Sequence, residues 1–131
     1  MRIVSIAIVC LALTATGCNS PTSPSTPETV TLAPGQAASY GSLTVRFIGV
    51  TSDSRCPGDV VCVQLGDAFV AIDAAVRGPA RRFDLQLFDA NSRVARLDDY
   101  TIEVTAVDPY PLVADPIEPD EYRLTLVIAR R

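Results

Sequence analysis

Four cysteines are the residues of this chain best suited to chemistry, and their positions separate them into two groups. Cys10 lies in an apolar run near the amino terminus, and Cys18 directly follows the small residues Ala15-Thr16-Gly17. Cys56 and Cys62 lie much farther along the chain. Small residues followed by a cysteine at the end of a short apolar run are the layout of a bacterial lipoprotein signal. We therefore expect cleavage before Cys18 and lipidation of its thiol.

The segments around Cys18 agree with this interpretation. Residues 1–17 begin with a cationic Arg2 and continue into an uncharged apolar run of 11 residues from Ile3 to Leu13. That run is well short of the roughly 20 residues of a membrane-spanning helix, so we expect a signal peptide. Ordinary secretion without acylation is the alternative, because Ala15 stands where leucine is the commoner residue.

Residues 18–27 are predicted to be the lipidated cysteine and a tether. After Cys18 the segment holds only Asn, Ser, Pro and Thr, which cannot bury a core, so it should stay extended. The expected location is the cell envelope, with a membrane bound through the lipid on Cys18. Asn19 is not the aspartate associated with inner-membrane retention, which favours the outer membrane if the host has two.

Cys56 and Cys62 are predicted to form a disulfide, because an exported domain meets oxidising conditions. Between them, Cys56-Pro57-Gly58-Asp59 fits a type II turn that would bring the two cysteines together. A catalytic redox pair is the alternative. Such pairs usually have two intervening residues at the start of a helix, and this segment has five intervening residues and no helical pattern.

The same segment carries a resemblance to known proteins. Asp53-Ser54-Arg55-Cys56-Pro57, four further residues, Cys62-Val63 and then Gly66-Asp67-Ala68 are similar to a segment of small uncharacterised bacterial lipoproteins and secreted proteins. The similarity covers residues 43–72, with a weaker echo in Asp108-Pro109-Tyr110-Pro111. Those proteins generally carry an aromatic residue soon after the second cysteine, where this chain has Gln64. The resemblance implies an exported, β-rich domain and no particular activity.

The composition excludes several classes of function. The chain has no histidine and no lysine, so it cannot form a Ser-His-Asp or Cys-His system, a Ser-Lys dyad or a Schiff base. We predict no cofactor, no metal site and no catalytic residues. The formal net charge is −4 and becomes −5 when Arg2 is removed with the signal, which argues against nucleic acid as a partner. A hydrolase of envelope or extracellular glycans that uses only carboxylates remains the alternative to a non-enzymatic protein.

Residues 28–131 are predicted to form a single all-β domain. Apolar residues alternate with polar ones, and Gly and Pro interrupt the runs, which is typical of antiparallel strands over a core. The expected strands are residues 29–32, 43–50, 67–77, 82–87, 100–106 and 122–128. Strands with one inner face each favour an antiparallel two-sheet sandwich, immunoglobulin-like in general architecture, with a small β-barrel as the alternative.

The connection from Asp108 to Glu121 is the candidate binding loop. It holds four prolines, the aromatic Tyr110 and the acids Asp115 and Glu118. Prolines reduce the entropy lost when a loop orders, and tyrosine offers a flat contact surface. A plain connector with solvated acids is the alternative. The sequence as a whole therefore predicts a binding or structural module of the envelope with a protein or glycan partner; a protease inhibitor would belong to the same class.

Overall fold

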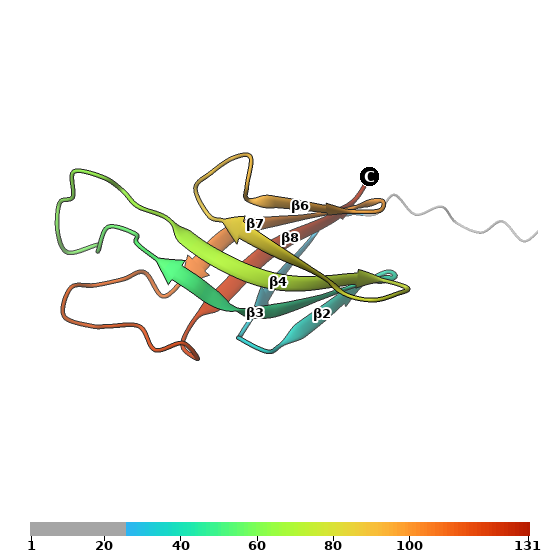
Figure 1. Ribbon diagram of the computed structural model, residues 1–131, viewed down its shortest axis with the longest axis horizontal. Helices are drawn as coiled ribbons and strands as arrows, with labels where there is room; N and C mark the ends of the chain where they lie inside the picture. The colour runs from blue at the N-terminus through green and yellow to red at the C-terminus, as the bar shows by residue number, and fades with distance from the viewer. Residues whose placement is uncertain (1–25) are drawn as a thin grey trace, which may run out of the picture.

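The computed structural model describes residues 26–131, which form eight β-strands in two layers and contain no helix (Figure 1). The predicted signal, Cys18 and all but the end of the predicted tether lie outside the described residues. Within the described part, no helix is long and apolar enough to cross a membrane.

Each layer is a four-stranded sheet in which every neighbouring pair is antiparallel. The first sheet consists, in spatial order, of β1 (Glu28–Leu32), β8 (Arg123–Arg130), β7 (Tyr100–Asp108) and β6 (Val94–Leu97). The second consists of β2 (Ala37–Tyr40), β3 (Leu43–Asp53), β4 (Ala68–Val76) and β5 (Arg81–Gln86).

The predicted two-sheet sandwich is confirmed, and the sheets do not close into the barrel that was the alternative. All six expected strands are present. The sequence pattern missed β2 and β6, which have four residues each and are too short to show a period of two clearly.

The connectivity differs from that of an immunoglobulin domain. Strands β2 to β5 are sequential neighbours, and so are β6 to β8, with β1 added beside β8. Immunoglobulin chains instead pass repeatedly between the two sheets. The likeness is therefore one of general architecture, with two meanders facing each other.

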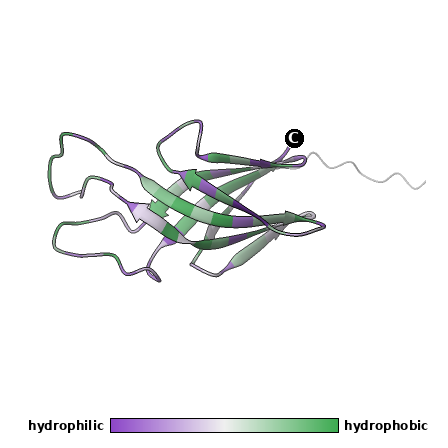
Figure 2. Ribbon diagram, viewed as in Figure 1, coloured by the Kyte–Doolittle hydropathy of each residue, from purple (hydrophilic) through white to green (hydrophobic). Residues whose placement is uncertain are grey.

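The core lies between the sheets and is built from the alternating apolar positions of both (Figure 2). Ten of its side chains are the largest that are fully buried. They are Phe47, Leu43, Ile72, Ile102, Leu124, Leu126, Ile128, Val45, Val70 and Val104. Burying such aliphatic and aromatic groups supplies the main force that holds the two layers together.

The face of β7 that points into the core changes partway along the strand. The register against β8 shifts between Val104 and Ala106, so the strand carries an extra residue there. Because one added residue exchanges the two faces of a strand, Ala106 is only half-buried and Val107 is buried in its place. This shift brings the backbone of Val107 to the end of the core, next to the long loops.

The two ends of the sandwich carry different connections. The tether end consists of the short turns 41–42, 77–80 and 98–99, with the first described residue, Thr26, and the C terminus nearby (right in Figure 1). The loop end consists of the long connections 54–67, 87–93 and 109–122 (left in Figure 1). Long loops on a rigid sandwich are where binding residues are most often found.

Replacing Phe47 tests the role of the core. Its side chain has no exposed surface, so F47A should lower the free energy of unfolding by about 3–5 kcal/mol in urea denaturation. F88A is the matched control: Phe88 is 54% exposed, and its loss should change stability by no more than about 0.5 kcal/mol. Similar losses in the two variants would contradict this assignment of the core.

Candidate functional site

The loop end carries every large hydrophobic side chain that is exposed in the described part of the chain. Val61 and Val63 are completely exposed, at 100% and 104% of the reference area. We call the whole set the loop-end patch. It comprises Val60, Val61, Val63, Leu65, Phe88, Tyr110, Leu112 and Val113. Exposed apolar groups gathered in one region, with none elsewhere, are typical of an interaction surface.

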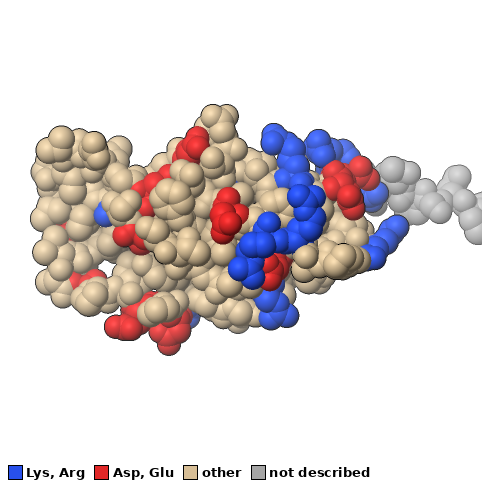
Figure 3. Space-filling model, viewed as in Figure 1, with Lys and Arg blue, Asp and Glu red and all other residues tan. Residues whose placement is uncertain are grey.

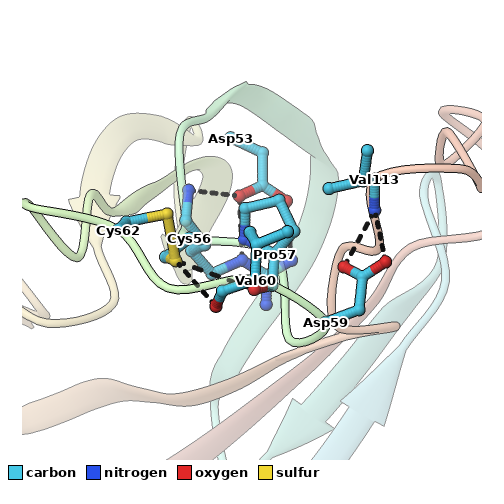
Figure 4. Close-up of a disulfide and its surroundings, with 8 residues drawn as sticks. Asp53, Cys56, Pro57, Asp59, Val60, Cys62 and Val113 are labelled. Carbon is cyan, nitrogen blue, oxygen red and sulfur yellow. Dashed lines mark hydrogen bonds and ion pairs between the residues drawn. A yellow bond between two sulfur atoms is a disulfide. The ribbon is translucent and has the colours of Figure 1, made fainter.

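The predicted disulfide between Cys56 and Cys62 is present, with the two Cα atoms 5.9 Å apart (Figure 4). The turn between the cysteines is not the predicted type II turn. It is centred on Gly58 and Asp59, its hydrogen bond runs from the Val60 N–H to the Pro57 carbonyl, and Gly58 does not adopt a positive φ. The Gly58 N–H donates to the carbonyl of Pro111 in loop 109–122, so a contact with another loop accompanies the shift of the turn.

Two long loops are joined into one unit next to this disulfide. The Gly58 N–H of loop 54–67 donates to the carbonyl of Pro111 at 2.9 Å. The Asp59 carboxylate accepts the Val113 N–H, with nitrogen–oxygen distances of 3.0 and 3.3 Å (Figure 4). Most of the loop-end patch therefore stands on two loops that hold each other in place.

Beneath these loops lies Arg55, the only charged or polar residue that is buried in the described chain, at 4% exposure. Its guanidinium forms a two-pronged ion pair with Asp53, at 2.8 Å from Nε to Oδ1 and 2.6 Å from Nη2 to Oδ2. It also donates to the carbonyls of Val107 and Pro109, and the Tyr110 ring covers it at 5.1 Å from the ring centroid. One cation thus ties the start of one loop to the start of the other.

The ionisation of this cluster follows from its contacts. Burial alone would raise the pKa of Asp53, but hydrogen bonds and charge from Arg55, with the Tyr122 hydroxyl, hold that pKa below its usual value. Burial likewise opposes the charge of Arg55, but Asp53 outweighs it and raises the Arg55 pKa. Burial and the Asp53 charge raise the pKa of the Tyr122 hydroxyl. The pair therefore stays ionised and the phenol stays neutral near pH 7.

Asp67 fixes the third loop in the same way. Its carboxylate accepts the backbone N–H groups of Leu87 and Phe88 at 3.1 and 3.0 Å. The preceding residue must be glycine: Gly66 has a φ of +65°, and a Cβ there would lie 1.7 Å from the Ser54 carbonyl oxygen. Loop 87–93 is thereby attached to loop 54–67.

The residues predicted for the binding loop are separated by the structure. Tyr110 packs onto Arg55 and remains 47% exposed. Asp115 and Glu118 are exposed farther along the loop, where the Glu118 N–H donates to the Glu121 carboxylate. Arg55 and Asp67 were not predicted from the sequence to have a role. The available signal was the segment singled out by resemblance, since that segment contains both and its echo contains Pro109 and Tyr110.

Two features of the described residues bear on metal-dependent chemistry and on the carboxylate-only hydrolase. Between residues 26 and 131, no three His, Cys, Asp or Glu side chains are placed to share a metal ion. A glycosidase needs a carboxylic acid with a raised pKa, and the shift at Asp53 is in the opposite direction. Asp53 is therefore unsuited to act as the general acid of a hydrolase.

A second concave surface lies against the outer face of β3 and β4. It is an open groove of about 430 Å³ with a largely apolar lining. Arg82, at its margin, is already paired with Asp73. The lining residues are Pro34, Ile48, Gly49, Val50, Thr51, Ala71, Arg82, Pro119 and Asp120. The groove lacks converging polar groups of the kind that usually fix a small ligand, so the loop end is the better candidate.

Comparison with known proteins adds no function: no family model, no curated protein and no solved structure matches this chain.

Substitution of Asp53 tests the buried ion pair. D53N leaves Arg55 charged and without its carboxylate, so the free energy of unfolding at pH 7 should fall by about 3 kcal/mol or more. Because the folded pKa of Asp53 is depressed, its stabilisation is present above the unfolded pKa of about 3.9 and is lost as the pH falls through the folded value. D53N should remove that part of the acid sensitivity in urea unfolding measured from neutral to low pH.

D73N is the matched control, because Asp73 is also paired with an arginine but that pair is exposed to solvent. Solvent screening makes such a pair weak, so D73N should change stability and its pH dependence much less. Equal effects of D53N and D73N would show that the buried pair does not hold the loops.

Proposed function

We propose that this protein is a lipid-anchored module of the bacterial cell envelope that binds a partner protein through its loop end. The observation that carries the proposal is the confinement of exposed large hydrophobic side chains to loops that a disulfide, an ion pair and shared hydrogen bonds hold in place. A domain of this size has no need to expose eight such side chains together unless they meet another surface.

The chemistry of the patch favours a protein partner over a glycan. Six of its members are aliphatic and offer no side-chain hydrogen-bonding groups to sugar hydroxyls: Val60, Val61, Val63, Leu65, Leu112 and Val113. Protein interfaces bury apolar side chains at their centre within a polar rim. The acids of loop 109–122 lie in the same region and would supply part of that rim.

The rigidity of the loops supports the same conclusion. Binding costs free energy when flexible loops must become ordered, and this cost falls when they are already fixed. Here Arg55, Asp59 and Asp67 attach each long loop to its neighbour before any partner arrives. The patch would then bind as a preformed surface.

The envelope location rests on the sequence and on the disulfide. Residues 1–18 have the layout of a lipoprotein signal, and the Cys56–Cys62 bond suits an oxidising compartment outside the cytosol. Thr26 lies at the tether end, where its carbonyl accepts the Tyr40 hydroxyl at 2.8 Å. A chain anchored at Cys18 would therefore hold the loop-end patch on the side away from its attachment point.

A crosslinking experiment tests the binding surface. A photoreactive residue at position 61 of the full-length protein in its native host should give a defined crosslinked species. Adding V63N and L112N should reduce its yield at least about tenfold, because polar groups replace apolar contacts without altering the core.

The matched control places the photoreactive residue at Ala80, which is exposed on a turn of the tether end. If position 80 gives the same species, or if the two polar substitutions leave the yield from position 61 unchanged, the loop end is not the binding surface.

Mass spectrometry of the native protein tests the anchor. We expect the mature chain to begin at Cys18 with acyl chains attached, and Cys56 and Cys62 to be joined. Because the lipid is predicted on the new terminal cysteine, C18A should release the protein from the membrane fraction. An unmodified chain that still begins at Met1 would overturn the anchoring.

A further inference from the structure

The two ends of the sandwich differ in charge as well as in shape. Five exposed arginines lie at or beside the tether end, against three acids there. The arginines are Arg77, Arg81, Arg96, Arg130 and Arg131, and the acids are Glu28, Asp98 and Asp99. The loop end shows the reverse, with seven acids against two arginines in its three loops. Figure 3 shows the basic side chains gathered toward the end with the C terminus, together with one acidic cluster. The opposite end is mainly uncharged, and acidic side chains lie between it and the basic ones.

Two of these arginines, Arg130 and Arg77, lie near Tyr100. The Arg130 guanidinium lies 5.9 Å from the centroid of the Tyr100 ring. The Tyr100 hydroxyl accepts the Ser42 N–H at 3.2 Å, which ties the turn 41–42 to β7. The hydrogen bonds from Ser42, and then the charges of Arg130 and Arg77, lower the pKa of Tyr100, as expected when both cations lie near the ring. Arg77, from the turn 77–80, and Arg130, at the end of β8, therefore lie near one rigid base.

The chain enters the domain at this base. Tyr40 packs edge-on against Tyr100, with ring centroids 6.1 Å apart, and its hydroxyl donates to the Thr26 carbonyl. Thr26 is the eighth residue after Cys18. A chain of that length spans at most about 28 Å. A lipid on Cys18 would therefore keep the arginine-bearing end close to the membrane surface.

We propose that the tether end docks on the anionic phospholipid headgroups of the membrane that holds Cys18. This inference rests on the proposed lipid anchor and adds an orientation to it. The phosphate groups of anionic lipids attract arginines near the surface. Each such arginine should raise the equilibrium constant for docking about fivefold. The three acids of the tether end oppose docking, but the five arginines there outnumber them. The acids at the loop end lie beyond the Debye length of about 8 Å at physiological salt, so they oppose docking little.

The tether makes weak attraction sufficient. A short linker holds the domain at a local concentration on the order of millimolar, so docking needs no high intrinsic affinity. The docked orientation places the turn 77–80 and the C-terminal arginines against lipid and the loop-end patch toward its partner. The domain would then act as a spacer with a fixed direction.

The test uses the mature chain, which begins at Cys18, coupled through that thiol to a maleimide phospholipid. Coupling at this residue reproduces the anchor whether or not the native protein is acylated. Hydrogen–deuterium exchange is then compared on phosphatidylcholine bilayers with and without phosphatidylglycerol. We expect amides of the turn 77–80 to exchange about fivefold more slowly on the anionic bilayer, and loops 54–67 and 109–122 to be unchanged.

The triple variant R77Q/R96Q/R131Q should abolish this protection, and raised salt should weaken it. R123Q is the matched control, because it removes one exposed arginine outside the tether end and should leave the protection intact. Equal exchange on the two bilayers, or protection that survives the triple substitution, would overturn the docking proposal. Failure of native acylation appears separately in the mass of the purified protein, so the two proposals can fail independently.

Discussion

Arg55 carries a full positive charge and is buried beneath two loops. Its burial is tolerated because hydrogen bonds, an ion pair and an aromatic ring compensate for the lost contact with water. A carboxylate takes two of its donors, two carbonyls take others, and an aromatic face covers the plane. Removing a charge from water costs several kcal/mol unless its partners are complete. The partners come from strands β3 and β7 and from the start of loop 109–122. The native path of each long loop therefore depends on the other being in place.

This dependence explains how the domain can expose so much apolar surface. Loops with unattached valines and leucines would fold inward or associate without specificity. Here the disulfide closes one loop, the Asp59 carboxylate holds the next, and Asp67 holds the third. The apolar side chains of the patch remain outside because the backbone beneath them has no freedom to bury them.

The two ends of the molecule suit two different neighbours. The tether end has tight turns, arginines and the entry of the chain, whereas the loop end has long, cross-linked, apolar and acidic connections. Charge separation along one axis gives a protein a preferred direction near a charged surface. In the proposed function, one end faces lipid headgroups and the other a protein, and the rigid sandwich sets the distance between them.

The sequence alone predicted the features that depend on local pattern: six strands from their alternation, a two-layer core, and a disulfide from two cysteines in a chain expected to be exported. Tertiary structure decided the rest. The short strands β2 and β6 form only because β3 and β7 offer hydrogen-bonding edges, and the extra residue in β7 exchanges its inner face at Val107. Arg55, in a chain of eleven arginines, becomes central only when Val107 and Pro109 arrive from more than fifty residues away. The alternation of apolar and polar residues can be read from neighbouring positions in the chain. A buried charge can be recognised only when folding has brought its partners to it.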